Sequence, residues 1–237
     1  MTLRGSPLPI VGLQGLSVID YPGKLCATVF TAGCNFRCPY CYNVDIVLNH
    51  QGLPVIPERD VLNLIYGRRG FLDGLCVGGG EPTLHRALPD FLFKVKALGV
   101  SVKVDTNGSR PRMLLKLVED ELVDYVAMDV KAPLRRYPEV VRFKVDVDAV
   151  RRSIRLLRRS SVDHEFRTTV VPGLLDGDDL EEIARALSGS KRYVIQQFRP
   201  GRTLCPDFAE VKPYAASQLK AFRDRVAPYF GECRLRL

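Results

Sequence analysis

Short apolar runs alternate with longer amphipathic stretches along this chain of 237 residues. The apolar runs are nearly continuous, which is typical of parallel strands that are covered on both faces. The longer stretches repeat their apolar residues every three or four positions, as surface helices do. The pattern predicts strands at 25–31, 74–78, 100–105, 125–130, 165–171 and 193–198. Helices are expected at 58–69, 87–98, 110–119, 148–159, 178–187 and 214–226.

Six strand–helix units follow one another without a linker, a repeat or a low-complexity tract. This order predicts an α/β fold with a parallel sheet in a single domain. A doubly wound sheet and a partial barrel both fit the alternation. They differ in where the polar residues gather, because a barrel collects its chemistry at the carboxyl ends of several strands. The strand-like segment 233–237 has no decided place in the sheet.

Composition and charge limit the class of protein. Hydrophobic residues make up 46% and charged residues 26% of the chain, which are ordinary values for a globular protein. No apolar run approaches the roughly 20 residues of a membrane-spanning helix, and the N-terminal residues lack the apolar stretch of a signal peptide. We therefore expect a cytoplasmic protein without a membrane partner. The net charge of +8 fits either an anionic partner or a basic proteome.

Three of the seven cysteines lie in one short loop, directly after the first predicted strand. Cys34, Cys38 and Cys41 have the spacing CxxxCxxC, and such clustering in a cytosolic chain favours metal binding or redox chemistry over disulfides. Three thiolates can hold an iron–sulfur cluster with one open position, or a zinc ion completed by a distant Cys or His. No obvious fourth ligand comes from the spacing of the other cysteines, Cys26, Cys76, Cys205 and Cys233.

A glycine-rich run, Gly78-Gly79-Gly80-Glu81-Pro82, follows the second predicted strand. Glycines let a backbone approach a ligand closely, and a carboxylate at this strand end can accept hydrogen bonds from a cationic amine. The same run is also an ordinary turn signal. Both interpretations remain open on the residues alone.

Charged and polar residues end the next strands as well. Asp105 and Thr106 close the third strand, where the active face of a barrel lies. Asp129 and Lys131 share one face of the fourth strand, and they either serve a ligand or neutralise each other, because burying an unpaired charge is costly. Arg167 in the fifth strand can clamp a carboxylate with two hydrogen bonds or form an internal salt bridge with Glu165 or Asp163.

The cysteine spacing, with Tyr40 just before the last cysteine, resembles the signature of the radical S-adenosylmethionine (radical SAM) superfamily. The resemblance implies that Cys34, Cys38 and Cys41 hold one 4Fe-4S cluster per chain. It implies that the amino and carboxylate groups of S-adenosylmethionine chelate the fourth iron, and that the reduced cluster releases a 5′-deoxyadenosyl radical. No catalytic residue is then expected beyond the cluster and its S-adenosylmethionine. Tyr40 would lie near the adenine.

The same resemblance gives roles to the other strand ends. Gly79, Gly80 and Glu81 match the family's GGE motif, which implies that they bind the methionine ammonium. The strings DTNG at 105–108 and MDVK at 128–131 look like their counterparts in glycyl-radical-enzyme activases. There they imply contacts with S-adenosylmethionine and a nearby cation, so Asp105, Thr106, Asp129 and Lys131 are expected to bind the cofactor. Arg167 is added as a further cofactor-binding candidate, because its side chain can clamp a carboxylate.

The segments 16–24 and 33–43 narrow the resemblance to the activating proteins of anaerobic ribonucleoside-triphosphate reductase. More broadly the chain is similar to the pyruvate formate-lyase activating enzyme group. The likeness covers nearly the whole chain, but its specific motifs lie within 16–131. Tyr42 departs from many relatives, in which a histidine is expected. The implied fold is a partial (β/α)6 TIM-type barrel, with 1–24 as an N-terminal extension packing on a core domain of 25–237.

The implied activity is that of an activase, which forms a glycyl radical on a partner enzyme through the deoxyadenosyl radical. The expected partners are a glycyl radical enzyme, first of all anaerobic ribonucleotide reductase, and a one-electron donor such as ferredoxin or flavodoxin. A nucleic-acid partner is not expected. Two alternatives stay open: a radical enzyme that modifies a small molecule or an RNA base, and a non-enzymatic iron–sulfur or zinc protein.

Overall fold

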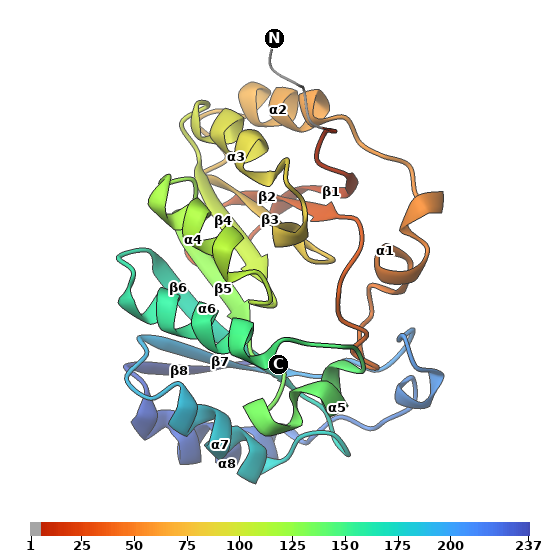
Figure 1. Ribbon diagram of the computed structural model, residues 1–237, viewed down its shortest axis with the longest axis vertical. Coiled ribbons are helices and arrows are strands. Elements are labelled where there is room, and N and C mark those ends of the chain that lie inside the picture. The colour runs from red at the N-terminus through yellow and green to blue at the C-terminus, as the bar shows by residue number, and fades with distance from the viewer. Residues whose placement is uncertain (1–5) are drawn as a thin grey trace. The chain divides into compact units, whose positions relative to one another are not determined.

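One sheet carries all the strands of residues 6–237, the part of the chain that the computed structural model describes. The strands follow one another in chain order across the sheet (Figure 1). They are β1 (Ile10–Ser17), β2 (Cys26–Thr31), β3 (Gly74–Gly79), β4 (Ser101–Thr106), β5 (Tyr125–Asp129), β6 (Asp163–Val170), β7 (Arg192–Gln197) and β8 (Glu232–Arg236). β1 is antiparallel to β2, whereas β2–β3, β3–β4, β6–β7 and β7–β8 are parallel pairs.

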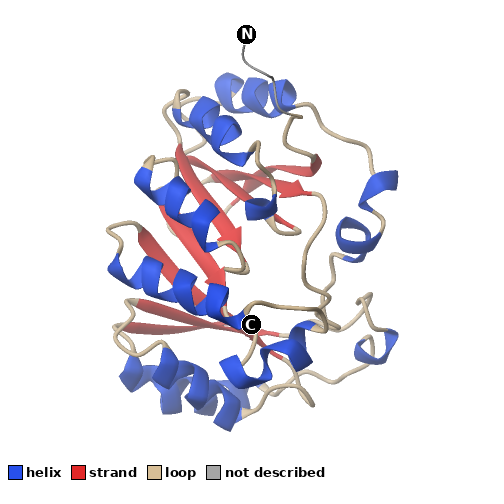
Figure 2. Ribbon diagram, in the orientation of Figure 1, coloured by secondary structure: helices blue, strands red, loops and turns tan. Residues whose placement is uncertain are grey.

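Helices alternate with most of these strands (Figure 2). The α-helices are α1 (Val44–Leu48), α2 (Glu58–Gly67), α3 (Leu88–Lys96), α4 (Pro111–Glu119), α5 (Tyr137–Val141), α6 (Val147–Arg159), α7 (Gly177–Ala186) and α8 (Ala216–Val226). Short 3₁₀ turns add η1 (His50–Gly52), η2 (Pro82–Leu84), η3 (Leu134–Arg136), η4 (Pro206–Phe208) and η5 (Ala227–Tyr229). None of the helices in the described part of the chain has the length and apolar character needed to cross a membrane.

The six predicted strands are confirmed as β2 to β7, and the six predicted helices as α2, α3, α4, α6, α7 and α8. The α/β class with a mostly parallel sheet is therefore confirmed. The segment at 233–237, whose place was undecided, joins the sheet as β8 beside β7. β1 was not predicted, because it is an irregular edge strand: its pairing with β2 is interrupted twice, and alternation of buried and exposed positions is weak.

The chain divides into two compact units, and the division falls within β5. Unit 1 contains the described residues up to Asn35, together with Asp45–Thr106 and Arg110–Val126. Unit 2 contains Phe36–Val44, Asn107–Ser109 and Ala127–Leu237. Each unit has its own apolar core, and the cysteine segment begins in unit 1 and continues in unit 2.

In unit 1 the core lies between β2, β3, β4 and the helices α3 and α4. Its strands contribute fully buried aliphatic residues, and the helices add Phe91, Leu92, Leu114 and Leu117. The loop after β1 packs an aromatic ring on this unit, because Tyr21 is buried with its ring centroid 5.8 Å from that of Tyr125. Position 74 must be glycine here, since a Cβ would lie 2.9 Å from the carbonyl oxygen of Ser101 and 3.1 Å from the Tyr21 ring.

In unit 2 the helix α6 holds the turn that follows β4. α6 starts at Asp146, whose side chain caps it by accepting from the amide of Ala149 at 3.0 Å. Its buried stripe includes Ser153, which is fully buried and donates from Oγ to the carbonyl oxygen of Gly108 at 2.7 Å. Further along the unit, α7 and α8 lie side by side, and α8 packs against β7 and β8 (Figure 1).

Replacing Ser153 with Ala should lower the free energy of unfolding by roughly 1–2 kcal/mol, because a buried hydrogen bond to the Gly108 carbonyl is lost. Urea unfolding followed by circular dichroism measures this change. Ser160→Ala is the matched control, since the Ser160 hydroxyl bonds only locally, to the carbonyl of Leu157 at 2.9 Å. Equal effects of the two substitutions would contradict the anchoring role of Ser153.

Candidate functional site

In unit 1 the root of the cysteine loop is hydrogen-bonded to the glycine-rich turn. The amide of Gly80 donates to the carbonyl of Thr31, and the amide of Glu81 donates to the carbonyl of Gly33, both at 2.9 Å. The chain therefore runs side by side in these two segments, immediately before Cys34. This backbone pairing fixes where the first cysteine leaves the sheet.

The two glycines of the turn are required by space. Gly79 has a φ of +102°, and a Cβ on it would lie 2.6 Å from the amide nitrogen of Thr31. A Cβ on Gly80 would lie 1.8 Å from the carbonyl oxygen of Gly33. The pairing is possible only because neither residue has a side chain.

Glu81 is fully buried and does not extend into solvent. Its Oε1 accepts hydrogen bonds from the Thr83 amide at 3.1 Å, from the Thr83 hydroxyl, and from the Thr106 hydroxyl at 2.7 Å. It thereby caps η2 and joins the end of β3 to the end of β4. The structure thus brings together two of the predicted site residues, Glu81 and Thr106. The contact of Glu81 with the methionine ammonium remains a prediction.

Asp105 lies one residue before the end of β4, on the opposite face from Thr106, and beside a lysine that was not selected from the sequence. Lys103 Nζ pairs with Asp105 Oδ1 and lies 3.5 Å from the sulfur of Cys76. Cys76 in turn donates to Asp105 Oδ1 at 3.8 Å. The signal that could have found Lys103 is a charged residue inside the apolar string VKVD, two positions before Asp105.

In unit 2 the rest of the cysteine loop is held by backbone hydrogen bonds from a distant segment. The amide of Leu204 donates to the carbonyl of Cys41 at 3.0 Å, and the amide of Cys205 donates to the carbonyl of Pro39 at 2.9 Å. We call residues 203–205 the strap. No residue pattern predicted it, because irregular segments that pair through their backbones alone have no characteristic residues. All cysteines of residues 6–237 are free of disulfides.

Tyr40 is a buried residue with an unsatisfied hydroxyl. Its side chain is 6% exposed, and its hydroxyl has no hydrogen-bond partner among the described residues. Burial, followed by the nearby thiol of Cys38, raises the pKa of Tyr40 well above its usual value. Burial likewise raises the pKa of Cys41. A buried hydroxyl without a partner is uncommon in native proteins and indicates a place where a ligand's polar atom would fit.

Asp129, Lys131 and Arg167 form one charged cluster in unit 2. Arg167 Nε donates to Asp129 Oδ1 at 2.8 Å, and Lys131 Nζ donates to Asp129 Oδ2 at 3.1 Å. Burial by itself would raise the pKa of Asp129, but the charges of Arg167 and Lys131 outweigh it and hold this pKa well below its usual value. Both cations thus neutralise Asp129 within the unit, and the acid that Arg167 contacts here lies on the neighbouring strand β5.

The comparisons with known proteins agree with these motifs. Residues 28–187 match the family model described as the radical SAM superfamily. The chain belongs to the radical SAM superfamily. A 4Fe-4S cluster and S-adenosylmethionine are the cofactors that this family implies.

Two sequence relatives and one solved protein illustrate the likeness. A protein of Methanocaldococcus jannaschii named as a glycyl-radical enzyme activating enzyme is 35% identical over 217 residues, which cover 89% of this chain and 88% of that protein. The pyruvate formate-lyase-activating enzyme of Staphylococcus epidermidis is 32% identical over 101 residues, 40% of each chain. The third, Streptococcus suis SuiB, has a crystal structure with its precursor peptide SuiA.

That SuiB structure superposes with a TM-score of 0.69 at 12% identity, covering 87% of this chain and 48% of SuiB. SuiB bound to S-adenosylmethionine gives a TM-score of 0.67 at 12% identity, covering 85% of this chain and 48% of SuiB. This chain therefore spans about half the length of the solved protein. At such low identity the likeness shows the fold of this radical SAM chain and nothing more.

The residues present fit the cofactors that the radical SAM family implies. Three cysteines that form no disulfide stand in one loop, the glycines let the backbone at the end of β3 approach the root of that loop closely, and Tyr40 offers a hydroxyl without a hydrogen-bond partner. Among the described residues, no set of three or more His, Cys, Asp or Glu side chains is already gathered as a metal site. Tyr42, at the family's expected histidine position, is 73% exposed.

Replacing Gly80 with Ala should break the pairing at the root of the cysteine loop, because the new Cβ would overlap the Gly33 carbonyl. We expect a loss of about 1–3 kcal/mol in the free energy of unfolding and a lower iron content after anaerobic reconstitution. Urea unfolding and iron analysis measure the two effects. Gly52→Ala is the control, since a Cβ there meets nothing within 4 Å; iron loading of Gly80→Ala equal to that control would contradict the role of the pairing.

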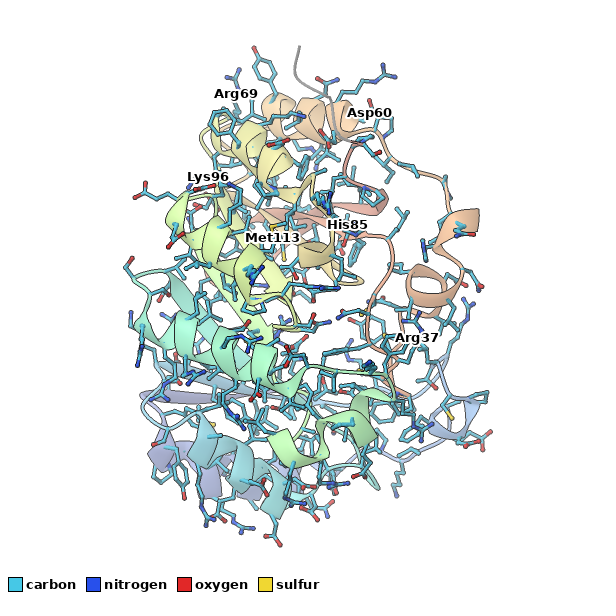
Figure 3. All side chains as sticks on the ribbon, in the orientation of Figure 1. Arg37, Asp60, Arg69, His85, Lys96 and Met113 are labelled. Atoms are coloured by element: carbon cyan, nitrogen blue, oxygen red, sulfur yellow. The ribbon has the colours of Figure 1, made fainter. Side chains whose placement is uncertain are left out.

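The side chain of His85 also contacts the root of this loop and should make stability depend on pH. Its Nε2 lies 2.9 Å from the Ala32 carbonyl oxygen (Figure 3), and burial lowers the pKa of His85 below its usual value of about 6.5. The unfolded chain therefore binds this proton first as the pH falls. Stability should be complete above about pH 6.5 and decline below it, and less steeply in His85→Gln. Urea midpoints at pH 7, 6 and 5 test this, and identical slopes would refute it.

Proposed function

We propose that this radical SAM chain is an activase that forms a glycyl radical on a partner enzyme. The observation that carries the proposal is the similarity along 217 residues, 35% of them identical, to a relative named as a glycyl-radical enzyme activating enzyme. The shorter match to a pyruvate formate-lyase-activating enzyme supports the same class. Anaerobic ribonucleotide reductase is the first partner to test, because segments 16–24 and 33–43 resemble its activating proteins.

We infer that Cys34, Cys38 and Cys41 hold one 4Fe-4S cluster. The close spacing of the three thiols supports this, and so do the glycine pairing before Cys34 and the strap behind Cys41, which restrict the loop. When bound and reduced, the cluster with S-adenosylmethionine supplies a radical that takes the Cα hydrogen of a glycine. The protein's part is to orient the cofactor and to exclude water.

The strand ends of unit 1 are suited to the ammonium group of S-adenosylmethionine. Gly79 and Gly80 bring their backbone close to the loop root, where an ammonium group can be met by carbonyl oxygens. The Glu81 carboxylate holds this turn in place by accepting hydrogen bonds from Thr83 and Thr106. Its buried carboxylate adds negative potential beside the ammonium.

In unit 2, Tyr40 and the charged residues Asp129, Lys131 and Arg167 are suited to the adenine and the carboxylate of S-adenosylmethionine. The unsatisfied hydroxyl of Tyr40 can bind the adenine. Lys131 and Arg167 are held by Asp129 and supply positive charge for the carboxylate of S-adenosylmethionine. Asp129 is held ionised, and it therefore keeps both cations in fixed directions. A one-electron donor such as ferredoxin or flavodoxin is required for the reduction.

Anaerobic reconstitution should give about four irons per chain and reductive conversion of S-adenosylmethionine to methionine and 5′-deoxyadenosine. With anaerobic ribonucleotide reductase added, electron paramagnetic resonance should show a protein-based doublet. Cys38→Ala should abolish cluster, cleavage and doublet, because the cluster loses a ligand. Cys233→Ala in β8 is the matched control and should keep all three.

The other outcomes separate the alternatives. Full cleavage by Cys38→Ala would remove the cluster assignment, and a bound zinc without any cleavage would show a non-enzymatic metal protein. Cleavage without a doublet on any glycyl radical enzyme tested would favour a radical enzyme that modifies a small molecule or an RNA base.

A further inference from the structure

Lys103 is a charged residue in the middle of an apolar strand. Its side chain is 1% exposed, and its strand neighbours Val102 and Val104 are fully buried. Lysines are almost never buried in this way unless they are paired, because an ammonium loses its hydration. A lysine at this position therefore has a specific electrostatic task.

The Lys103 ammonium is in direct contact with the carboxylate of Asp105. The two residues are two positions apart on β4, so their side chains share one face of the sheet. Lys103 Nζ pairs with Asp105 Oδ1 and contacts the sulfur of Cys76, its register partner on β3, at 3.5 Å. Asp105 itself is 27% exposed at the strand end, so it is the member of the pair that a ligand can reach.

Within unit 1, Lys103 is a cation in direct contact with Asp105. The thiols of Cys26 and Cys76 face it, and burial raises the pKa of both, which keeps them neutral. Asp20 places a negative charge near both thiols and accepts a hydrogen bond from Thr28 at 2.8 Å. In this part of unit 1 the Asp105 carboxylate therefore has a lysine ammonium as its neighbour.

We propose that Lys103 is a positioning residue whose ammonium occupies the place beside Asp105 that a bound monovalent cation would otherwise take. The assignment of Asp105 to the S-adenosylmethionine site rests on the proposed function, but the exchange of lysine for a cation does not. The family resemblance led us to expect a cation near this aspartate. The consequence is that this chain keeps Asp105 ionised and oriented without sodium or potassium.

The test removes the ammonium and offers a cation in its place. Lys103→Met keeps the length of the side chain and leaves a carboxylate without its ammonium. In choline chloride the apo variant should melt roughly 5–10 °C below the wild type. Replacing choline by sodium or potassium at equal ionic strength should raise its melting temperature by about 3–6 °C, because a ligand that binds only the folded state stabilises it. The wild type should respond equally to all three salts.

Two control variants separate this exchange from general effects of salt and packing. Lys96→Met removes a lysine on the surface of the same unit (Figure 3), one that pairs with Asp124 at 2.6 Å, and it should show no preference for sodium or potassium over choline. The double variant Lys103→Met with Asp105→Asn removes both charges. It should be more stable than Lys103→Met in choline and should also lose the response to sodium and potassium.

A melting temperature of Lys103→Met that does not distinguish sodium or potassium from choline would overturn the proposal, as would a wild type that is itself stabilised by them. If Lys103→Met fails to fold, the wild type still decides. Its affinity for S-adenosylmethionine, measured with the cluster loaded, should be the same in choline and sodium buffers, and a tenfold difference would refute the proposal. Because the apo experiment needs neither cluster nor partner, its result does not depend on whether a glycyl radical forms.

Discussion

Two backbone hydrogen bonds, from Gly80 to Thr31 and from Glu81 to Gly33, are the constraint on which the candidate site depends. They join the end of β3 to the segment that leads from β2 into the cysteine loop. Side chains could not achieve this, because the two segments approach more closely than any Cβ would allow. The two glycines lose more conformational entropy on folding than other residues would, but no other residue fits at their positions. The direction in which Cys34 leaves the sheet follows from this contact.

Buried charges around the strand ends are balanced inside each unit. Asp105 has Lys103 in unit 1, and Asp129 has Lys131 and Arg167 in unit 2. The pKa of Asp129 is held well below its usual value by two cations that are covalently part of the chain and cannot diffuse away. Such preorganised groups bind a charged cofactor without first reorienting, which is how enzyme sites gain electrostatic strength over water.

The sequence was sufficient for the features that repeat or that carry chemistry. Apolar runs and helical periodicity located β2 to β7, because buried parallel strands need such runs. The cysteine spacing and the GGE, DTNG and MDVK strings located the candidate site. Sequence reasoning could not find β1, whose pairing is irregular, or the strap, whose contact with Pro39 and Cys41 uses backbone atoms alone. It also passed over Lys103, since only the structure shows that a lysine in VKVD points at Asp105 and not at solvent.

The strap contacts the cysteine loop but lies outside the residues that match the family model. The radical SAM model ends at residue 187, yet Leu204 and Cys205 hold the carbonyls of Cys41 and Pro39. Within the strap the Thr203 hydroxyl donates to the Cys205 carbonyl at 2.8 Å, and three residues after it the ring of Phe208 is covered by Arg142. A loop that carries two of the proposed cluster ligands is thus held by residues more than 150 positions later in the chain. Because closing such a contact costs chain entropy, the loop gains its final order only when β7 and the segment after it have folded.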